Sequence, residues 1–324
     1  MPDISADMIL KRIKLTDKLP VAIIAISVIC GAAGAALFIN GHFAAGLLFL
    51  CIGPAFATLV QWLFMGKGIT KRMQTLLSSY ENTSPPSAVP GVAWCLTDST
   101  INTIYANIAR INTLSEKAPL LMLLAELYIM RGEHEKAVGC LDTARSGISG
   151  RDTQMLIRYY AAVIALYDSA GDRDSVLRAC EEARPIVEKD YARSWETMFC
   201  TLAIKICEHK AKGEYSYALF HMADYMRVYD SIRFPNPASP FHRLERGELL
   251  ISRAEMYLMS GEFTKAAEYT DMGGPMLFDC PYLLARANDL SRRIYREMHP
   301  EQSLDGTQAP VPELPKEDVL TPHV

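Results

Sequence analysis

One long stretch of this chain lacks every charged side chain. From Leu19 to Gly66 there is no Asp, Glu, Lys or Arg, although these residues make up 22% of the 324-residue sequence. A surface helix of a soluble domain carries a polar face, so this absence excludes such a helix here. The run contains two apolar segments, residues 20–39 and 43–65, and each is long enough to cross bilayer hydrocarbon. The sequence therefore predicts a two-helix transmembrane hairpin over residues 20–65.

The uncharged run has basic residues on both sides, and these predict its orientation. They are Lys11, Arg12, Lys14 and Lys18 before it, and Lys67, Lys71 and Arg72 after it. Basic flanks of membrane spans tend to stay in the cytoplasm. We therefore expect an integral membrane protein of two spans in a bacterial plasma membrane, with both termini cytoplasmic. Residues 1–19 form a cytoplasmic N-terminal segment, and residues 66–93 form a basic juxtamembrane helix and a proline-rich linker.

Two alternatives to the membrane hairpin stay open. The apolar segments could form buried helices of a soluble protein, or the first of them could be a cleaved signal peptide. A transport role has little support, because His42 in the turn is the only acidic or basic side chain in the run. The hairpin is thus expected to be an anchor for the rest of the chain.

Motifs of catalysis and metal binding are also missing. The eight cysteines form no C-x-x-C pair, and this usage is typical of reduced thiols. The chain has no H-E-x-x-H, G-x-S-x-G or phosphate-loop motif. We therefore predict that the protein is not an enzyme and uses no cofactor or metal. One cluster leaves an enzymatic or metal-binding alternative open: Cys200 and Cys207 share a helix face near His209, although packing is the simpler interpretation.

The charge balance bears on the class of partner. The formal net charge is −4, and the basic excess around the apolar run leaves the chain beyond Glu81 acidic. Nucleic-acid binding needs a basic patch, and the sequence shows none. We therefore expect a protein or peptide partner and no nucleic acid.

The second part of the chain contains an internal repeat. In four segments an apolar helix pattern ends at a glycine, an acidic residue follows, and a small residue stands five positions after the glycine. The glycines are Gly132, Gly171, Gly213 and Gly261, and the small residues are Ala137, Val176, Ala218 and Ala266. Glycine ends a helix in the left-handed conformation without steric cost, and an acid suits the positive end of the next helix. The pattern predicts closely packed helix pairs.

The first of these turns contains the segment GEHEKA, in which His134 lies between two glutamates. Such a segment could be a metal site or an acid/base pair. The other three turns have Arg173, Tyr215 and Phe263 in place of His134. The turn therefore does not need a histidine, and we interpret GEHEKA as a bend between helices.

The packing positions of the repeats resemble those of the tetratricopeptide repeat family. They are Leu121, Leu124, Ala125, Tyr128, Gly132, Ala137, Leu141 and Ala144 in the first unit, and Leu250, Ala254, Tyr257, Gly261 and Ala266 in the last. The resemblance implies an all-α fold over residues 94–298, an antiparallel helix-pair solenoid. It also implies that the first helix of each pair lines a groove for a peptide or partner helix. By helical phase this groove would include Met122, Glu126, Arg158 and Glu255.

These observations lead to one functional hypothesis and two alternatives. Residues 98–116 and 281–298 would cap the array, and residues 299–324 would form a disordered tail. We expect a membrane-anchored adaptor or scaffold that binds a partner protein at the cytoplasmic face, in assembly or regulation of a membrane complex. The alternatives are an enzyme or metal-binding protein that uses the groove, and a membrane hairpin that regulates a neighbouring membrane protein.

Overall fold

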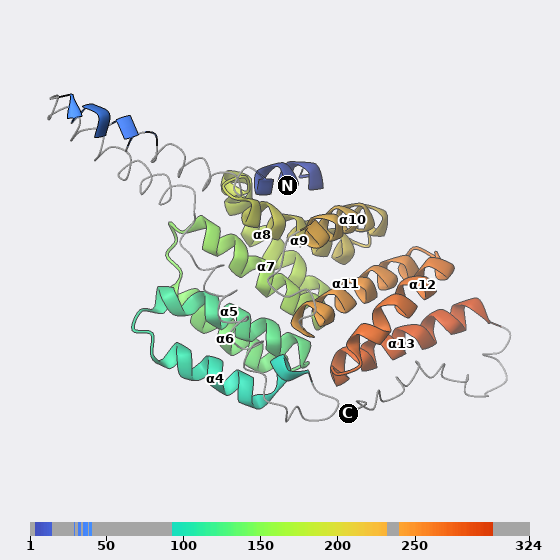
Figure 1. Ribbon diagram of the computed structural model, residues 1–324. Coiled ribbons are helices and arrows are strands. Elements are labelled where there is room, and N and C mark those ends of the chain that lie inside the picture. The colour runs from blue at the N-terminus through green and yellow to red at the C-terminus, as the bar shows by residue number, and fades with distance from the viewer. Residues whose placement is uncertain are drawn as a thin grey trace, which may run out of the picture.

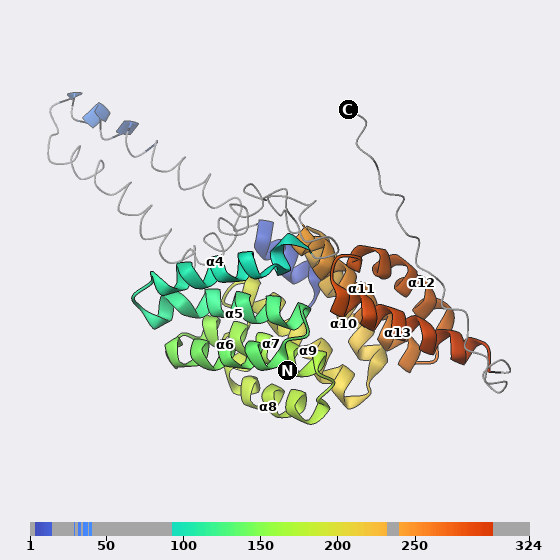
Figure 2. The ribbon, with the colours of Figure 1, turned by 90° about the horizontal axis from the view of Figure 1, so that it is seen from below.

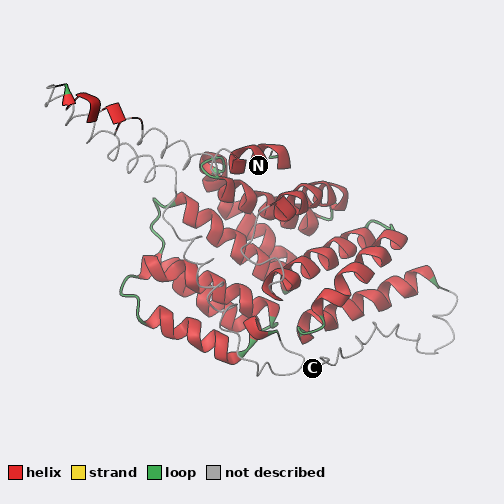
Figure 3. Cartoon of the chain, viewed as in Figure 1, coloured by secondary structure: helices red, strands yellow, loops and turns green. Residues whose placement is uncertain are grey.

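The computed structural model describes residues 4–14, a few positions between 29 and 40, residues 93–231 and residues 240–300. Every regular element in these ranges is a helix, and they contain no strand (Figures 1 and 3). The all-α class is therefore confirmed for the described part of the chain. The predicted linker and the C-terminal tail lie almost entirely outside the described residues.

The predicted membrane localisation is wrong. No helix in the described ranges is long and apolar enough to cross a bilayer. Even the strongly apolar helix α5, Leu114–Met130, falls short of a span, because it has only 17 residues and contains a glutamate in its second half. We therefore withdraw the two-span integral membrane localisation. The predicted spans themselves, residues 20–39 and 43–65, lie outside the described residues apart from scattered positions in the first.

Consecutive helices pack in pairs from α5 onward. The closest packing joins α5 to α6, α7 to α8, α9 to α10 and α11 to α12. A short helix η1 and helix α4 precede these pairs, and η2 and α13 follow them. The bounds are η1 Trp94–Leu96, α4 Asp98–Ala109, α5 Leu114–Met130, α6 His134–Gly147, α7 Thr153–Ser169, α8 Arg173–Asp190, α9 Trp195–Lys212, α10 Tyr215–Ser231, α11 Pro240–Met259, α12 Phe263–Gly273, η2 Gly274–Leu277 and α13 Pro281–Met298.

The turns inside the four pairs have the geometry that the sequence predicts. Each repeat glycine has a positive φ between 73° and 80°, and no other described residue has a positive φ. In each turn the amide of the following acid donates to the carbonyl five residues earlier, as Glu133 does to Tyr128 at 2.9 Å. This hydrogen bond defines a Schellman motif, which satisfies the last carbonyls of the helix. The four small residues after the turns are all at most 1% exposed, so the prediction of close pairs is confirmed.

The expected front helix over residues 98–116 is divided in two. Helix α4 ends at Ala109, and α5 begins at Leu114. Asn112 and Thr113 lie in the connection, and such residues favour helix boundaries because their side chains compete for backbone hydrogen bonds. The C-terminal helix has the predicted bounds, Pro281–Met298.

The two ends of the helical array meet. The Cys280 thiol donates to the carbonyl of Met130 at 3.1 Å, and the amide of Ala93 donates to the carbonyl of Asp279 at 2.7 Å. The rings of Tyr282 and His134 pack edge to face, with centroids 5.8 Å apart. One hydrophobic core joins α4, α5 and α6 to α11, α12 and α13 (Figure 2). The array therefore closes on itself instead of forming an open superhelix.

The N-terminal helix, residues 6–14, belongs to the same body. Ile4 and Ile9 are at most 1% exposed and pack with Met198, Leu202 and Val228 of α9 and α10. The chain thus places its first described residues beside α10 (Figure 1). Within the predicted N-terminal segment, residues 1–19, the described helix thus packs on α9 and α10, while the division of the chain into segments stays a prediction.

Candidate functional site

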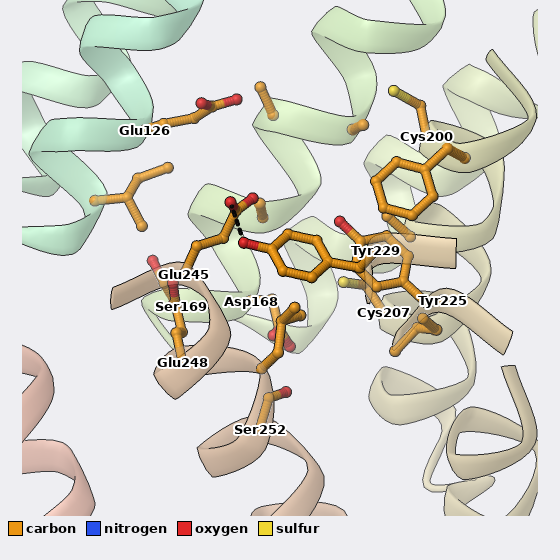
Figure 4. A pocket seen from close by; sticks show the side chains of 18 of the residues that line it. Glu126, Asp168, Ser169, Cys200, Cys207, Tyr225, Tyr229, Glu245, Glu248 and Ser252 are labelled. Atoms are coloured by element: carbon orange, nitrogen blue, oxygen red, sulfur yellow. Dashed lines mark hydrogen bonds between the residues drawn. The ribbon is translucent and has the colours of Figure 1, made fainter. Parts of the chain in front are cut away.

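A central cavity lies between the helix pairs. Its volume is about 470 Å³, and its lining comes from α5, α7, α9, α10, α11 and α13. The first helix of every pair contributes, because these helices form the inner side of the closed array. A volume of this order is typical of ligand sites in proteins. We take this cavity as the candidate site (Figure 4).

Side-chain caps fix the beginnings of two lining helices. The Asp152 carboxylate accepts a hydrogen bond from the Met155 amide at 3.2 Å and so caps α7. Ser194 and Thr197 form a capping box at the start of α9. Such caps satisfy amides that the helix leaves without partners. They therefore fix the beginnings of the two helices that supply Ala161, Ala162 and Ala165 and the ring of Phe199 to the lining.

The cavity lining combines small residues of α7 with aromatic residues of other helices. Ala161, Ala162 and Ala165 of α7 leave the space. Another part of the lining is an aromatic wall, where the rings of Phe199 and Tyr225 stack with centroids 4.1 Å apart. The other aromatic side chains of the lining are Trp195, Tyr229 and Phe241. The wall offers flat apolar and π-electron surface to an occupant.

Two carboxyl groups extend into the same space from different helices. Figure 4 shows Glu126 reaching from α5 and Glu245 from α11. Burial, reinforced by the charge of Glu245, raises the pKa of Glu126 to about 8, although Arg158 opposes this shift. Burial also raises the pKa of Glu248, again with a contribution from Glu245. Burial and nearby negative charge therefore disfavour the ionised forms of Glu126 and Glu248 when the cavity is empty of a cation.

Tyrosine hydroxyls orient part of this acidic group. The Tyr229 hydroxyl donates to Glu245 at 2.9 Å, as Figure 4 shows, and also lies 3.3 Å from the His242 carbonyl. Burial and the charge of Glu245 raise the pKa values of Tyr225 and Tyr229. Both phenols are consequently neutral at physiological pH. Glu245 is thus held in place, whereas no described residue donates a hydrogen bond to Glu126.

An ion-pair network forms one side of the cavity. Lys210 of α9 lies 2.9 Å from Asp168 of α7 and 3.3 Å from Glu255 of α11. Arg286 of α13 binds Glu255 through two hydrogen bonds of 2.8 and 3.0 Å, and it lies 3.7 Å from Glu248. Burial alone would raise the pKa of Glu255, but the charges of Lys210 and Arg286 outweigh it and lower the pKa to about 2. At neutral pH the Glu255 carboxylate is therefore ionised between two basic side chains.

The predicted groove residues can now be placed. Met122, Glu126 and Arg158 line the cavity. Glu255 is not part of the lining, but it binds Lys210 and Arg286, whose side chains are. Helical phase thus located this face of α5 and α7, while the role of these residues in binding a partner stays a prediction.

Other lining residues did not follow from the sequence. Tyr225 and Tyr229 come from α10, the second helix of its pair, and the resemblance assigned the groove to first helices only. Glu245 and Glu248 had a usable signal, because they lie ten and seven positions before Glu255 and therefore share its helix face. The acidic character of the cavity could have been predicted from this spacing.

Cys200, Cys207 and His209 do not form a common site in the structure. Both thiols line the cavity, and burial raises the pKa of Cys200 to about 11 and that of Cys207 well above its usual value. The thiols are therefore protonated and weak as nucleophiles or ligands. His209 instead lies 2.6 Å from Glu214 and stacks on the rings of Tyr217 and His221. Across the ranges that the structure describes, no three His, Cys, Asp or Glu side chains are grouped to hold a metal.

His134, in the segment GEHEKA, packs against side chains of two other helices. Its Nε2 atom lies 3.2 Å from the Ser169 hydroxyl and 3.5 Å from the Tyr282 hydroxyl. The side chain therefore links the first pair to α7 and to α13, at the place where the array closes.

Comparison with known proteins assigns no family to the chain. No protein-family model matches it, and no curated protein or solved structure matches it either. The resemblance to tetratricopeptide repeats thus stays a prediction from packing positions. Function has to be inferred from the geometry and charge of the cavity.

Proposed function

We propose that this chain is an adaptor of tetratricopeptide-like helix pairs that binds a segment of a partner protein in its central cavity. One observation carries the proposal: the inner helices of the successive pairs leave a cavity of about 470 Å³ between them, lined by Met122, Glu126 and Arg158 among others. In this reading the pairs form a solenoid whose end units contact each other. The helix pairs surround the cavity, and the side chains of their inner helices form the binding surface.

The size and lining of the cavity favour a short segment as the occupant. A cavity of this volume admits a few side chains but no folded domain. Its lining alternates apolar, aromatic and charged groups from six helices, so it offers contacts to both the apolar and the polar atoms of a peptide. Binding sites with a desolvated centre and charged groups around it are typical of protein recognition.

Binding of a small molecule is the second candidate function. The observation in its favour is that the volume falls within the range of about 300 to 1,000 Å³ that small-ligand sites occupy. The two candidates differ in what reaches the cavity, and a peptide screen separates them.

The test fills the cavity and asks whether peptide binding is lost. The full-length chain is applied to an array of random synthetic peptides, together with an Ala165→Trp variant. Ala165 lines the cavity and is exposed to it, so the indole occupies the space without displacing the core. An Ala106→Trp variant is the matched control, because Ala106 is an exposed alanine of α4 outside the lining.

The proposal expects peptides that bind the wild-type chain and the Ala106→Trp chain but not the Ala165→Trp chain. A screen without such peptides would overturn the proposal and leave the small-molecule site as the better candidate. Binding that all three chains share would also contradict it, because the peptide would then contact a surface other than the cavity.

A further inference from the structure

The charges inside the cavity are not balanced. Its lining contains five carboxylates and three basic side chains: Glu126, Asp168, Glu196, Glu245 and Glu248 against Arg158, Lys210 and Arg286. Two of the bases, Lys210 and Arg286, are bound in the ion-pair network. Outside that network the lining has three carboxyl groups, Glu126, Glu196 and Glu245, against one basic side chain, Arg158, so this part of the lining has the surplus of acidic groups.

Glu126 lines the cavity without a hydrogen-bond donor of its own. It is half-buried, and among the described residues none donates a hydrogen bond to it or forms an ion pair with it. Its nearest charged groups are Glu245 and Glu248 of α11, which repel it, and Arg158 of α7, which attracts it. The net effect is unfavourable to its charge, since the pKa is raised to about 8. A carboxyl group that lacks a donor and lies near two other carboxyl groups is costly to ionise, and a cationic occupant would offset this cost.

The aromatic wall is suited to the same kind of occupant. Phe199, Tyr225 and Tyr229 line the cavity together with the acidic group. An ammonium or guanidinium group is attracted to the face of an aromatic ring within about 6 Å of its centre. Apolar lining side chains, Met122 and Leu249 among them, can contact an aliphatic stem. A long side chain with an apolar stem and a basic head matches this arrangement.

We infer that the cavity recognises a lysine or arginine side chain of the partner segment, with Glu126 and Glu245 as the groups that contact its charge. The inference rests on the proposed function and specifies its ligand. The head group lies between the two carboxylates and the tyrosine rings, and the stem follows the apolar side chains. Binding of the cation favours the ionised form of Glu126, so a proton leaves this carboxyl group as the peptide binds.

The test compares peptide preference in neutral variants of two glutamates. The same array of random peptides is applied to the full-length wild type, to Glu126→Gln and to Glu188→Gln, a control at an exposed glutamate of α8 outside the lining. Glutamine has the shape of glutamate and no hydrogen bond is lost at Glu126, so the variant is expected to fold; circular dichroism verifies this.

We expect cavity-dependent peptides to be enriched in Lys and Arg for the wild type and for Glu188→Gln, and not for Glu126→Gln. Replacement of the critical Lys by norleucine should weaken binding about tenfold, in line with a charged hydrogen bond. Peptides that lose binding in the Ala165→Trp variant but are not enriched in Lys or Arg would overturn the inference, while the proposed function would stand. The absence of any cavity-dependent peptide would overturn both.

A free amine provides the remaining comparison. If n-butylammonium displaced the peptides at concentrations close to their own dissociation constants, the cavity would recognise the cation without a protein segment, and the assignment to a partner side chain would be wrong. The inference expects displacement only at far higher concentrations, because the amine lacks the backbone and neighbouring side-chain contacts of the peptide.

Discussion

At the scale of single residues, Glu126 gives the protein a characteristic pH dependence. Its pKa is about 8 in the folded chain, against an ordinary value of 4.5, because burial and Glu245 disfavour its charge. Between these two pH values the folded state holds a proton that the unfolded state has lost. Stability therefore decreases as pH rises through this interval and levels off above about pH 8.

The variant Glu126→Gln tests this residue. It cannot ionise, so its free energy of unfolding should exceed that of the wild type, and the difference should grow with pH by up to about 1.4 kcal/mol per unit between pH 4.5 and 8. Urea unfolding at about pH 5.5 and about pH 8.5 measures the effect. A difference between the two chains that is the same at both pH values would show that Glu126 ionises normally.

At the scale of elements, the turn glycines combine one backbone conformation with different surroundings. Gly132 and Gly171 have φ values of 73° and 74°. A Cβ atom at Gly171 would meet nothing within 4 Å, whereas one at Gly132 would lie 2.5 Å from the ring of Tyr282. The first turn therefore serves the closure of the array in addition to ending a helix.

This difference predicts unequal effects of the same substitution. Gly171→Ala should destabilise the protein by about 1–2 kcal/mol through backbone strain alone. Gly132→Ala should cost more, because the Tyr282 ring must also move. In a Tyr282→Ala background the cost of Gly132→Ala should fall to that of Gly171→Ala, which a double-mutant cycle of unfolding free energies measures. Equal costs of the two substitutions in the wild-type background would argue against the contact between the ends of the array.

The elements also show how far the sequence could predict this structure. The helix pairs and their turns were predictable because the Gly-acid sequence has a local cause in the Schellman motif. The closure through Cys280 and Met130 was not, since it joins residues far apart in the chain without a local signal. The localisation failed because it relied on the hydropathy of one run. Within the site, Met122, Glu126 and Arg158 followed from helical phase, whereas the tyrosines of α10 depend on how the third pair packs.

At the scale of the whole molecule, the ion-pair network ties successive inner helices together. It runs from Asp168 through Lys210 and Glu255 to Arg286, and so connects α7, α9, α11 and α13. Because these charges are largely buried, removal of one leaves the others without compensation. The network therefore joins four helices of the lining through charged side chains beside the cavity.

Substitution of Arg286 tests the network. Arg286→Met should lower the free energy of unfolding by about 3–5 kcal/mol, since Glu255 loses its bidentate partner. Removal of Glu255 as well, in Arg286→Met/Glu255→Leu, should recover part of this loss. In the wild type the contribution of Glu255 is present at neutral pH and is lost as pH falls from 4.5 toward 2, because its pKa is lowered in the folded state. Chemical unfolding of the three chains at neutral pH decides the point: a loss below about 1 kcal/mol would be typical of an exposed pair and would contradict the assigned role.

The central claim is that the cavity between the helix pairs holds a segment of a partner protein. Isothermal titration of the full-length chain with the tightest peptide from the array tests it most directly, with Ala165→Trp and Ala106→Trp measured beside the wild type. The account predicts an unchanged dissociation constant for Ala106→Trp and a loss of measurable binding for Ala165→Trp. Equal affinity of all three chains would contradict it.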